Sequence, residues 1–349
     1  MSVRVVDGTR PSRRLPAPRV APRFDLTLSE NPFPPLPSVL RAVHLALAQA
    51  NRYPEFLPRR LPSLIARHVG VRADQVVVGS GATGVALQIL QTLTTPGAQI
   101  VYSAPTFDGY PIMAEMTGLD AVPVPLDATG NQDLRAMRRA IDRRTALVVV
   151  CRPHNPTGTV IPADELKAFL SGLPARVPVI LDEAYVEFLG AAEYVDPLAL
   201  IAKHPGLLVL RTFSKAYGLA GLRIGYAFGN PELIARVGKL QLPFGLSAAA
   251  VAAVTASYAA EPELAARTLR ITEERDALRA ALVARGFAVP ESRANFLFVP
   301  GPGTTTALRR AGIAAKCYPD GSARIAVGDP AADRAVLEAL TSGPPRVTL

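Results

Sequence analysis

The sequence is poor in cysteine and has no apolar run long enough to cross a membrane. Its 349 residues include two cysteines, Cys151 and Cys317, and neither has the spacing of a metal-binding motif. Both fit a reduced environment as small core side chains. The longest apolar stretches, ALVVVC and LSAAAVAAV, fall far short of the ~20 residues of a transmembrane helix. Without a secretory signal pattern, the expected location is the cytoplasm, and no membrane partner or metal is expected.

Acidic residues are outnumbered, but the imbalance is concentrated in one segment. The chain has 38 Lys and Arg against 29 Asp and Glu, a net charge of +9. Residues 1–23 hold six arginines and one acid, are rich in proline and have no apolar period, so we predict a flexible basic arm there. The remainder has mixed charges and no basic stripe, so nucleic acid is not an expected partner. An interaction protein that is recruited through the arm remains an alternative.

Short β-branched runs alternate with helical patterns from about residue 75, as in parallel βαβ units. Hydrophobic residues make up 49% of the chain and charged residues 19%, as in a soluble globular protein. We predict an α/β fold with a mostly parallel sheet flanked by helices. The predicted strands are QVVV, QIVY, ALVVVC, VILD, LLVLR and IGYAF, and the predicted helices include residues 82–93, 163–170 and 231–242.

The pattern changes after about residue 260. One long amphipathic helix over residues 262–286, which Gly286 should end, precedes strands ANFLFV and ARIAV and a last helix at AADRAVLEAL. These elements predict a smaller α+β domain. The predicted division is the arm at 1–23, a segment at 24–50 that packs on the small domain, a large domain at 51–260 and a small domain at 261–349.

Glycines follow the first predicted strand. Gly79, Gly81 and Gly84 in VVVGSGATG match G-x-G-x-x-G, the pattern of a dinucleotide site. The next strand, QIVYSAP, ends without the acid that would hold a ribose, so a nicotinamide oxidoreductase is the weaker reading. The backbone N–H groups of Ala82 and Thr83 can instead receive a phosphate at a helix N-terminus. A tight turn with no ligand is the structural alternative.

Two further strand ends carry single polar groups. Asn155 in HNPTG precedes a proline, where asparagine commonly serves the turn alone. Asp182 follows three aliphatic residues, and a desolvated carboxylate there needs a cation, a ring N–H or water as its partner, unless it caps the next helix. Tyr185 lies three residues on. Ligands of open parallel sheets bind beyond the carboxyl ends of the strands, so these groups are candidates for one site.

Lys215 follows the strand LLVLR at a fourth strand end. Thr212 and Ser214 precede it, and Arg223 comes eight residues later. A lone lysine there would ordinarily be a solvated surface charge. Together, however, the strand ends supply a phosphate cradle, a buried carboxylate, an amide, a phenol and an amine. Pyridoxal 5'-phosphate needs this set for its phosphate, ring nitrogen, ring oxygen and aldehyde.

Four segments in this order, NRYP, HNPTG, LDEAY and TFSKAYGLAGLRIGY, resemble the fold-type I pyridoxal-phosphate-dependent aminotransferases (classes I and II), most closely the histidinol-phosphate and aromatic aminotransferase branch. The resemblance covers roughly residues 24–330 and implies a homodimer. It implies that Lys215 binds the cofactor aldehyde and carries the proton as catalytic base and acid. The remaining implied cofactor contacts are Asp182 at the ring nitrogen, Asn155 and Tyr185 at the ring oxygen, Phe107 and Ala184 on the two ring faces, and Ala82, Thr83, Thr212, Ser214, Arg223 and the neighbouring subunit's Tyr53 at the phosphate.

The resemblance also implies substrate contacts. Arg324 in SARIAVG would pair with the substrate α-carboxylate in the forked geometry that guanidinium favours, with Asn155 beside it. Two positions depart from the family pattern: Lys316 stands where arginine is usual, and Phe33 stands where some members have tyrosine. Both changes favour an aromatic or less phosphorylated amine, because lysine lacks the fork that grips phosphate twice.

The predicted activity is therefore amino transfer between histidinol phosphate or an aromatic amino acid and 2-oxoglutarate. The alternative is another pyridoxal-phosphate reaction at Cα, by a decarboxylase or an amino-acid oxidase, since the same lysine and aspartate support both.

Overall fold

A computed structural model describes residues 21–328 and 330–342. Residues 1–20 of the predicted basic arm (1–23) lie outside the described residues. The last seven residues of the predicted small domain also lie outside them. Arg23 is described, and its backbone N–H donates to the Gly312 carbonyl over 2.8 Å.

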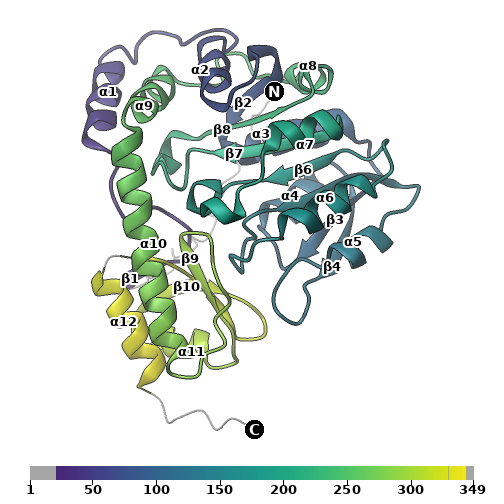
Figure 1. The fold of residues 1–349 in the computed structure, drawn as a ribbon. Coiled ribbons are helices and arrows are strands. Elements are labelled where there is room, and N and C mark those ends of the chain that lie inside the picture. The colour runs from purple at the N-terminus through teal and green to yellow at the C-terminus, as the bar shows by residue number, and fades with distance from the viewer. Residues whose placement is uncertain (1–20, 329, 343–349) are drawn as a thin grey trace, which may run out of the picture.

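The larger of two β-sheets has seven strands in the order β2-β8-β7-β6-β5-β3-β4 (Figure 1). All pairings are parallel except those of β8, which runs antiparallel to both β2 and β7. The strands are β2 (Val76–Ser80), β3 (Gln99–Ala104), β4 (Asp120–Pro125), β5 (Thr145–Cys151), β6 (Val179–Asp182), β7 (Leu207–Thr212) and β8 (Ile224–Gly229).

Helices cover both faces of this sheet, and further helices pack on the smaller sheet. The α-helices are α1 (Pro37–Leu47), α2 (Arg60–Val69), α3 (Gly81–Leu93), α4 (Gly109–Met116), α5 (Leu134–Arg139), α6 (Ala163–Ser171), α7 (Pro197–Lys203), α8 (Pro231–Gly238), α9 (Ala248–Ala259), α10 (Glu261–Val283), α11 (Thr304–Arg310) and α12 (Pro330–Thr341). Short 3₁₀ turns are η1 (Ala73–Gln75), η2 (Val186–Phe188), η3 (Ala191–Glu193) and η4 (Ala220–Leu222).

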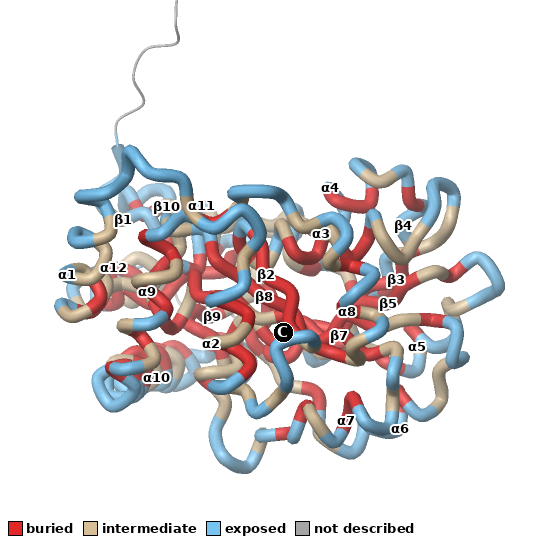
Figure 2. The backbone as a smooth tube through the Cα atoms, turned by 90° about the horizontal axis from the view of Figure 1, so that it is seen from above, coloured by how far each residue is buried: buried red, intermediate tan, exposed pale blue. Residues whose placement is uncertain are grey.

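Two hydrophobic cores form because successive side chains of a strand point to opposite faces. In β2, Val76 and Val78 belong to one core, together with residues of α2, α5, α6, α7 and α9. Val77 belongs to the other, with residues of α3, α4 and α8. Figure 2 shows β2, β8 and β7 as buried backbone inside the molecule, with exposed segments around them. Burial on both faces explains why the strands have continuous apolar sequences.

The smaller sheet has four strands in the order β1-β10-β11-β9, with a third core behind it that α10, α11 and α12 cover. Its strands are β1 (Phe24–Leu26), β9 (Phe296–Val299), β10 (Ile313–Cys317) and β11 (Ala323–Ala326). The long helix α10 descends from α9 to this sheet (Figure 1).

Residues 24–47 divide between the two parts of the fold. β1 pairs in parallel with β10, which attaches it to the smaller sheet. α1 packs mainly against α9, and Leu36 and Val39 join the core of the larger sheet. The segment is therefore shared, whereas the sequence predicted that all of it packs on the small domain. The predicted domain boundaries themselves stay a prediction.

The six predicted strands of the larger sheet are present. The sequence missed β4, whose DAVPVP contains two prolines and lies at the sheet edge, the place where a strand tolerates proline. It also missed β1 and β10. α8 ends at Gly238 rather than at the predicted Leu242, and α10 ends at Val283, three residues before Gly286, whose φ is +83°.

Candidate active site

The polar strand ends meet at one edge of the larger sheet. β2, β3, β5, β6 and β7 end there, and β8 begins there because it runs the opposite way. A cavity of about 390 Å³ opens at this edge. Thirteen of the residues predicted from the sequence line it: Ala82, Thr83, Phe107, Asn155, Asp182, Ala184, Tyr185, Thr212, Ser214, Lys215, Arg223, Lys316 and Arg324.

Lys215 presents its ε-amino group to the backbone and side chain of Ser29. Its Nζ lies 2.9 Å from the Ser29 carbonyl oxygen and 2.6 Å from Ser29 Oγ. Burial, together with the positive charge of Arg324, lowers the pKa of Lys215 to about 8, although Glu30 and Asp182 act in the opposite direction. Burial is the largest cause of this lowered pKa, ahead of the nearby cations. An amine with this pKa exchanges protons near neutral pH.

Asp182 is held at the end of β6 by two hydrogen bonds. Tyr110 donates its hydroxyl to Asp182 Oδ2 over 2.6 Å, and the Ala184 backbone N–H donates to Oδ1 over 3.0 Å. Burial raises the pKa of Asp182 above its ordinary value, while both hydrogen bonds oppose the rise because they stabilise the charged form. The carboxylate is thus fixed in place and would gain from a cationic N–H partner.

The turn between β2 and α3 has the features of an anion site. α3 begins at Gly81, where φ is +74°, and no side chain in the described part of the chain caps its N-terminus. A Cβ at Gly81 would lie 2.3 Å from Arg223 Nη2, so only glycine lets this guanidinium lie over the turn. Arg223 itself has a positive φ of 53°, which is uncommon for a residue with a side chain. Uncapped N–H groups and a cation together favour an anion such as phosphate.

Thr212 and Ser214 lie beside this turn. The Thr212 hydroxyl accepts from the Ser214 backbone N–H at 3.1 Å and donates to Ser214 Oγ at 3.0 Å. Both side chains are buried at the cavity wall.

Asn155 and Arg324, which the sequence assigned to neighbouring roles, are bonded to each other. Arg324 Nη1 donates to Asn155 Oδ1 over 2.8 Å, and Nη2 donates to the Thr27 carbonyl over 2.7 Å. Arg324 Nε is buried and has no hydrogen-bond partner among the residues that the structure describes. Burial raises the pKa of Tyr185 to about 12, so its phenol stays a hydrogen-bond donor.

The mouth of the cavity is built from both sheets. Asp108, after β3, forms an ion pair with Lys316 of β10, and Tyr318 lies next to it on the wall. Phe107 lies edge-on to Tyr110, with ring centroids 5.9 Å apart. Ala184 lines the same cavity.

Two predicted residues are not part of this cavity. The Phe33 ring contacts the guanidinium groups of Arg267 and Arg270 instead, and its backbone N–H donates to Asn31 Oδ1 over 3.0 Å. Tyr53 is 84% exposed and packs on Phe244, with ring centroids 4.7 Å apart. Its predicted contact requires a second subunit.

Sequence reasoning missed several residues that hold the site together. Ser29 and Tyr110 bond the two central groups, and Asn31 donates through Nδ2 to the carbonyls of Lys215 and Ala216. Cys151 was predicted as a core residue; it is buried and also lines the cavity. For Tyr110 the signal was weak, since it lies within α4 rather than at a strand end.

The family model for class I and II aminotransferases matches residues 22–340. An aromatic amino acid aminotransferase of Cutibacterium acnes is 41% identical over 320 residues, which cover 90% of this chain and 91% of that protein. One from Thermobifida fusca is 39% identical and covers 97% of this chain and 94% of that protein. A crystal structure of a histidinol-phosphate aminotransferase from Sinorhizobium meliloti, in complex with pyridoxal 5'-phosphate, superposes with a TM-score of 0.85 at 29% identity, covering 92% of this chain and 91% of that one.

The chain therefore belongs to the class I and II aminotransferase family, and it is an aminotransferase. The fold-type I architecture predicted from the sequence is confirmed. This assignment leaves the nicotinamide reading of the glycine turn without support. Within the described part of the chain, no helix combines the length and the apolarity that crossing a bilayer requires.

Proposed function

We propose that this protein binds pyridoxal 5'-phosphate and transfers an amino group from an aromatic amino acid to a 2-oxo acid, with 2-oxoglutarate as the predicted acceptor. The observation that carries the proposal is the convergence of Lys215, Asp182 and the uncapped start of α3 on one cavity. The location in the cytoplasm stays a prediction.

The residues present fit the cofactor. The first-turn N–H groups of Ala82 and Thr83 have no side-chain cap, and the Arg223 guanidinium lies over Gly81. Thr212 and Ser214 supply hydroxyls beside them. The phosphate would be held by these groups. Asp182 would accept a hydrogen bond from a protonated ring nitrogen, which would relieve the cost of its burial.

The other cavity residues would orient the reactants. Asn155 and Tyr185 would bond the ring oxygen, with Phe107 and Ala184 on either side of the ring. The buried Nε–H of Arg324 would donate a hydrogen bond to the substrate α-carboxylate.

When bound, pyridoxal phosphate supplies an electron-accepting ring that stabilises the charge left when the substrate Cα–H bond breaks. Lys215 would then act through Nζ, taking the proton from Cα and returning it as an acid. Its pKa of about 8 suits both directions of transfer.

The mouth of the cavity supports an uncharged substrate side chain. Lys316, the lysine that stands where the family usually has arginine, is the cation at the mouth, and its charge is already neutralised by Asp108. The phenol ring of Tyr318 lies next to Lys316, and the side chain of Leu28 lines the same cavity. To bind Lys316, a phosphorylated side chain would have to break the ion pair with Asp108, and its phosphate would then be repelled by the nearby Asp108 carboxylate. An aromatic ring would meet no such penalty.

A half-reaction screen tests this proposal. The protein loaded with pyridoxal phosphate is mixed with phenylalanine, tyrosine, histidinol phosphate or arginine, and conversion of the cofactor to its amine form is followed by visible absorption. We expect rapid conversion by the two aromatic amino acids. Faster conversion by histidinol phosphate would overturn the aromatic assignment. Carbon dioxide or peroxide release without dependence on a 2-oxo acid would favour a decarboxylase or an oxidase.

We further propose a homodimer in which Tyr53 completes the neighbouring site. An exposed apolar surface supports it, and the Phe244 backbone N–H donates to the Phe56 carbonyl over 2.8 Å to hold its two segments together. The exposed side chains are Tyr53, Phe56, Leu57, Leu240, Leu242 and Phe244. Large exposed apolar patches mark interfaces. Light scattering should give twice the chain mass, and Phe244→Glu should give a monomer with weaker cofactor binding; a wild-type monomer would contradict the proposal.

A further inference from the structure

Ser29 joins the amine and the phenol of the site through one hydroxyl group. Ser29 Oγ lies 2.6 Å from Lys215 Nζ and 2.8 Å from the Tyr185 hydroxyl. Ser29 is only 3% exposed and lies in the wall of the cavity. A protonated amine can only donate, so Ser29 Oγ accepts from it and is free to donate to Tyr185.

The segment that carries Ser29 is fixed from two sides. Asn31 Nδ2 donates to the Lys215 carbonyl at 3.1 Å and to the Ala216 carbonyl at 2.9 Å. Asn295, which is fully buried, donates to the Ser29 carbonyl at 3.1 Å and to the Glu30 carbonyl at 2.9 Å. The Ser29 oxygens therefore have a defined position relative to Lys215 before any substrate arrives.

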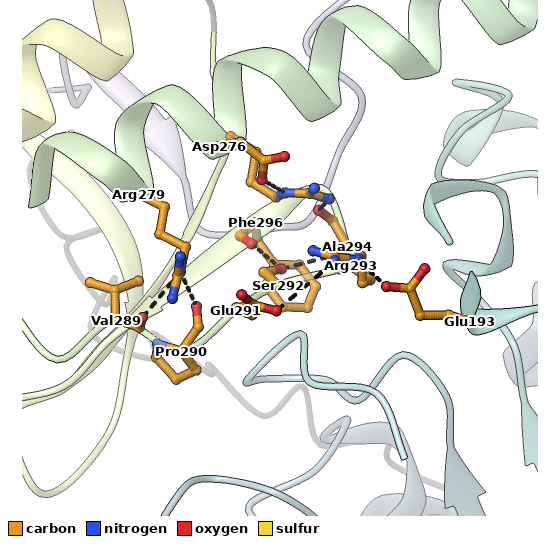
Figure 3. A network of polar contacts seen from close by, with 11 residues as sticks. Glu193, Asp276, Arg279, Val289, Pro290, Glu291, Ser292, Arg293, Ala294 and Phe296 are labelled. Carbon is orange, nitrogen blue, oxygen red and sulfur yellow. Dashed lines mark hydrogen bonds and ion pairs between the residues drawn. The ribbon is translucent and has the colours of Figure 1, made fainter. Parts of the chain in front are cut away.

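Asn295 in turn belongs to a segment, residues 289–296, that is anchored by arginine side chains. Figure 3 shows this network, which runs from α10 through residues 289–296 to Glu193 of η3. In it, Arg279 donates to the Val289 and Pro290 carbonyls, Ser292 donates to the Phe296 carbonyl and Arg293 pairs with Glu193. Arg275 also donates to the Ala294 carbonyl. The support for Ser29 thus extends to the long helix.

We propose that Ser29 is a positioning residue: its hydroxyl and carbonyl oxygens hold the Lys215 amine, when it is free, beside Tyr185 and in line for proton transfer. The inference rests on the proposed function. The oxygens also stabilise positive charge on the Lys215 nitrogen, which partly offsets the cost of burying it.

The test compares Ser29→Ala with the wild type, both loaded with pyridoxal phosphate. Both proteins should show the visible band of the lysine-bound cofactor. The pH midpoint of the acid limb of the kcat profile with phenylalanine, where the free Lys215 amine must lose its proton to act as a base, should fall by roughly one unit, because a hydrogen bond to a charged nitrogen is lost. With phenylalanine, kcat should fall about tenfold while KM changes less than twofold, in the range for impaired proton transfer. The isotope effect with α-deuterated phenylalanine should rise, since breaking Cα–H becomes more rate-limiting.

Two variants separate positioning from structural support. Ser29→Thr keeps the hydroxyl and should restore the wild-type midpoint. Ser292→Ala removes an equally buried serine hydroxyl from the supporting segment and should leave the midpoint unchanged. If Ser29→Ala does not fold, Ser29→Cys replaces it, because a thiol fills the site but bonds weakly; its midpoint should also fall.

An unmoved midpoint and isotope effect in Ser29→Ala or Ser29→Cys, with the band present in the wild type, would overturn this inference alone. A wild-type protein that forms no band with pyridoxal phosphate would overturn the proposed function, and this inference with it.

Discussion

The inner wall and the mouth of the cavity differ in how far their charged side chains are buried. On the inner wall, Asp182 is buried, and hydrogen bonds from Tyr110 of α4 and from the Ala184 backbone hold it. At the mouth, the side chains of Asp108 and Lys316 are 59% and 33% exposed, and they come from different sheets. Removing a partner of a buried charge costs several kcal/mol, whereas an exposed ion pair contributes about 0.2–1 kcal/mol.

This difference separates chemistry from selectivity. Burial disfavours the charged forms of Lys215 and Asp182, so these groups lower stability and are kept for the reaction, which they define. The mouth pair can change at little cost to the fold. Substrate preference is therefore encoded where substitutions are tolerated, and each prediction below tests one side of the contrast.

Removing the amine of the inner wall should have the largest effect. In Lys215→Ala, the visible band of bound cofactor should disappear and turnover should fall by about 10⁴-fold or more, the upper range for a lost general acid–base group. Absorption spectra and steady-state rates measure both. Lys167→Ala, at an exposed position of α6, is the matched control and should behave like the wild type. A surviving band in Lys215→Ala would mean that another amine binds the cofactor.

Changing the two carboxylates in the same way should give unequal results. Asp182→Asn removes a buried charge next to the proposed ring position, and we expect kcat with phenylalanine to fall by about 10²–10³-fold, as for a lost preorganised electrostatic contact. Asp108→Asn, at the mouth, should change it less than about fivefold. Similar losses in both variants would erase the contrast between wall and mouth.

Asp108→Asn should instead alter selectivity. With its partner charge gone, Lys316 becomes available to an anionic side chain, so kcat/KM for histidinol phosphate should rise about tenfold relative to phenylalanine, equivalent to about 1.4 kcal/mol. Lys316→Met in the Asp108→Asn background should cancel the gain. An unchanged ratio in Asp108→Asn would show that the pair does not select the side chain.

The same contrast explains what the sequence could predict. Strand ends of a buried parallel sheet are recognisable because apolar runs stop at a polar residue, so Lys215, Asp182 and Asn155 could be found. Ser29 bonds Lys215 across 186 residues, and Tyr110 bonds Asp182 across 72. No local pattern marks such pairs. Phe33 was predicted at the site from the resemblance alone, and its actual partners, Arg267 and Arg270, lie on α10.

Domain arrangement was also harder to predict from sequence. β10, with the sequence IAAKC, is only partly buried, so it lacks the apolar run that marks the central strands. The pairing of Lys316 with Asp108 depends on how the two sheets face each other. The identity of Lys316 could be interpreted from the sequence, but its neutralisation could not.

The smallest predicted effect concerns a carboxyl group that has one buried oxygen without a hydrogen-bond partner among the described residues, whereas both oxygens of Asp182 are bonded. Glu187 Oε2 is buried without a partner, and burial raises the pKa of Glu187 to about 7 from its ordinary 4.5. Between pH 4.5 and 7 the folded protein keeps a proton that the unfolded chain releases, so this group makes stability fall as pH rises.

The glutamine of the variant Glu187→Gln does not titrate. The melting temperature of the variant minus that of the wild type should therefore increase by a few degrees between pH 4.5 and 8. Glu165→Gln, at an exposed position, should show a constant difference over the same range. A constant difference for Glu187→Gln as well would mean that water or a neighbouring group forms hydrogen bonds with this carboxylate. Burial alone would then not raise the pKa of Glu187.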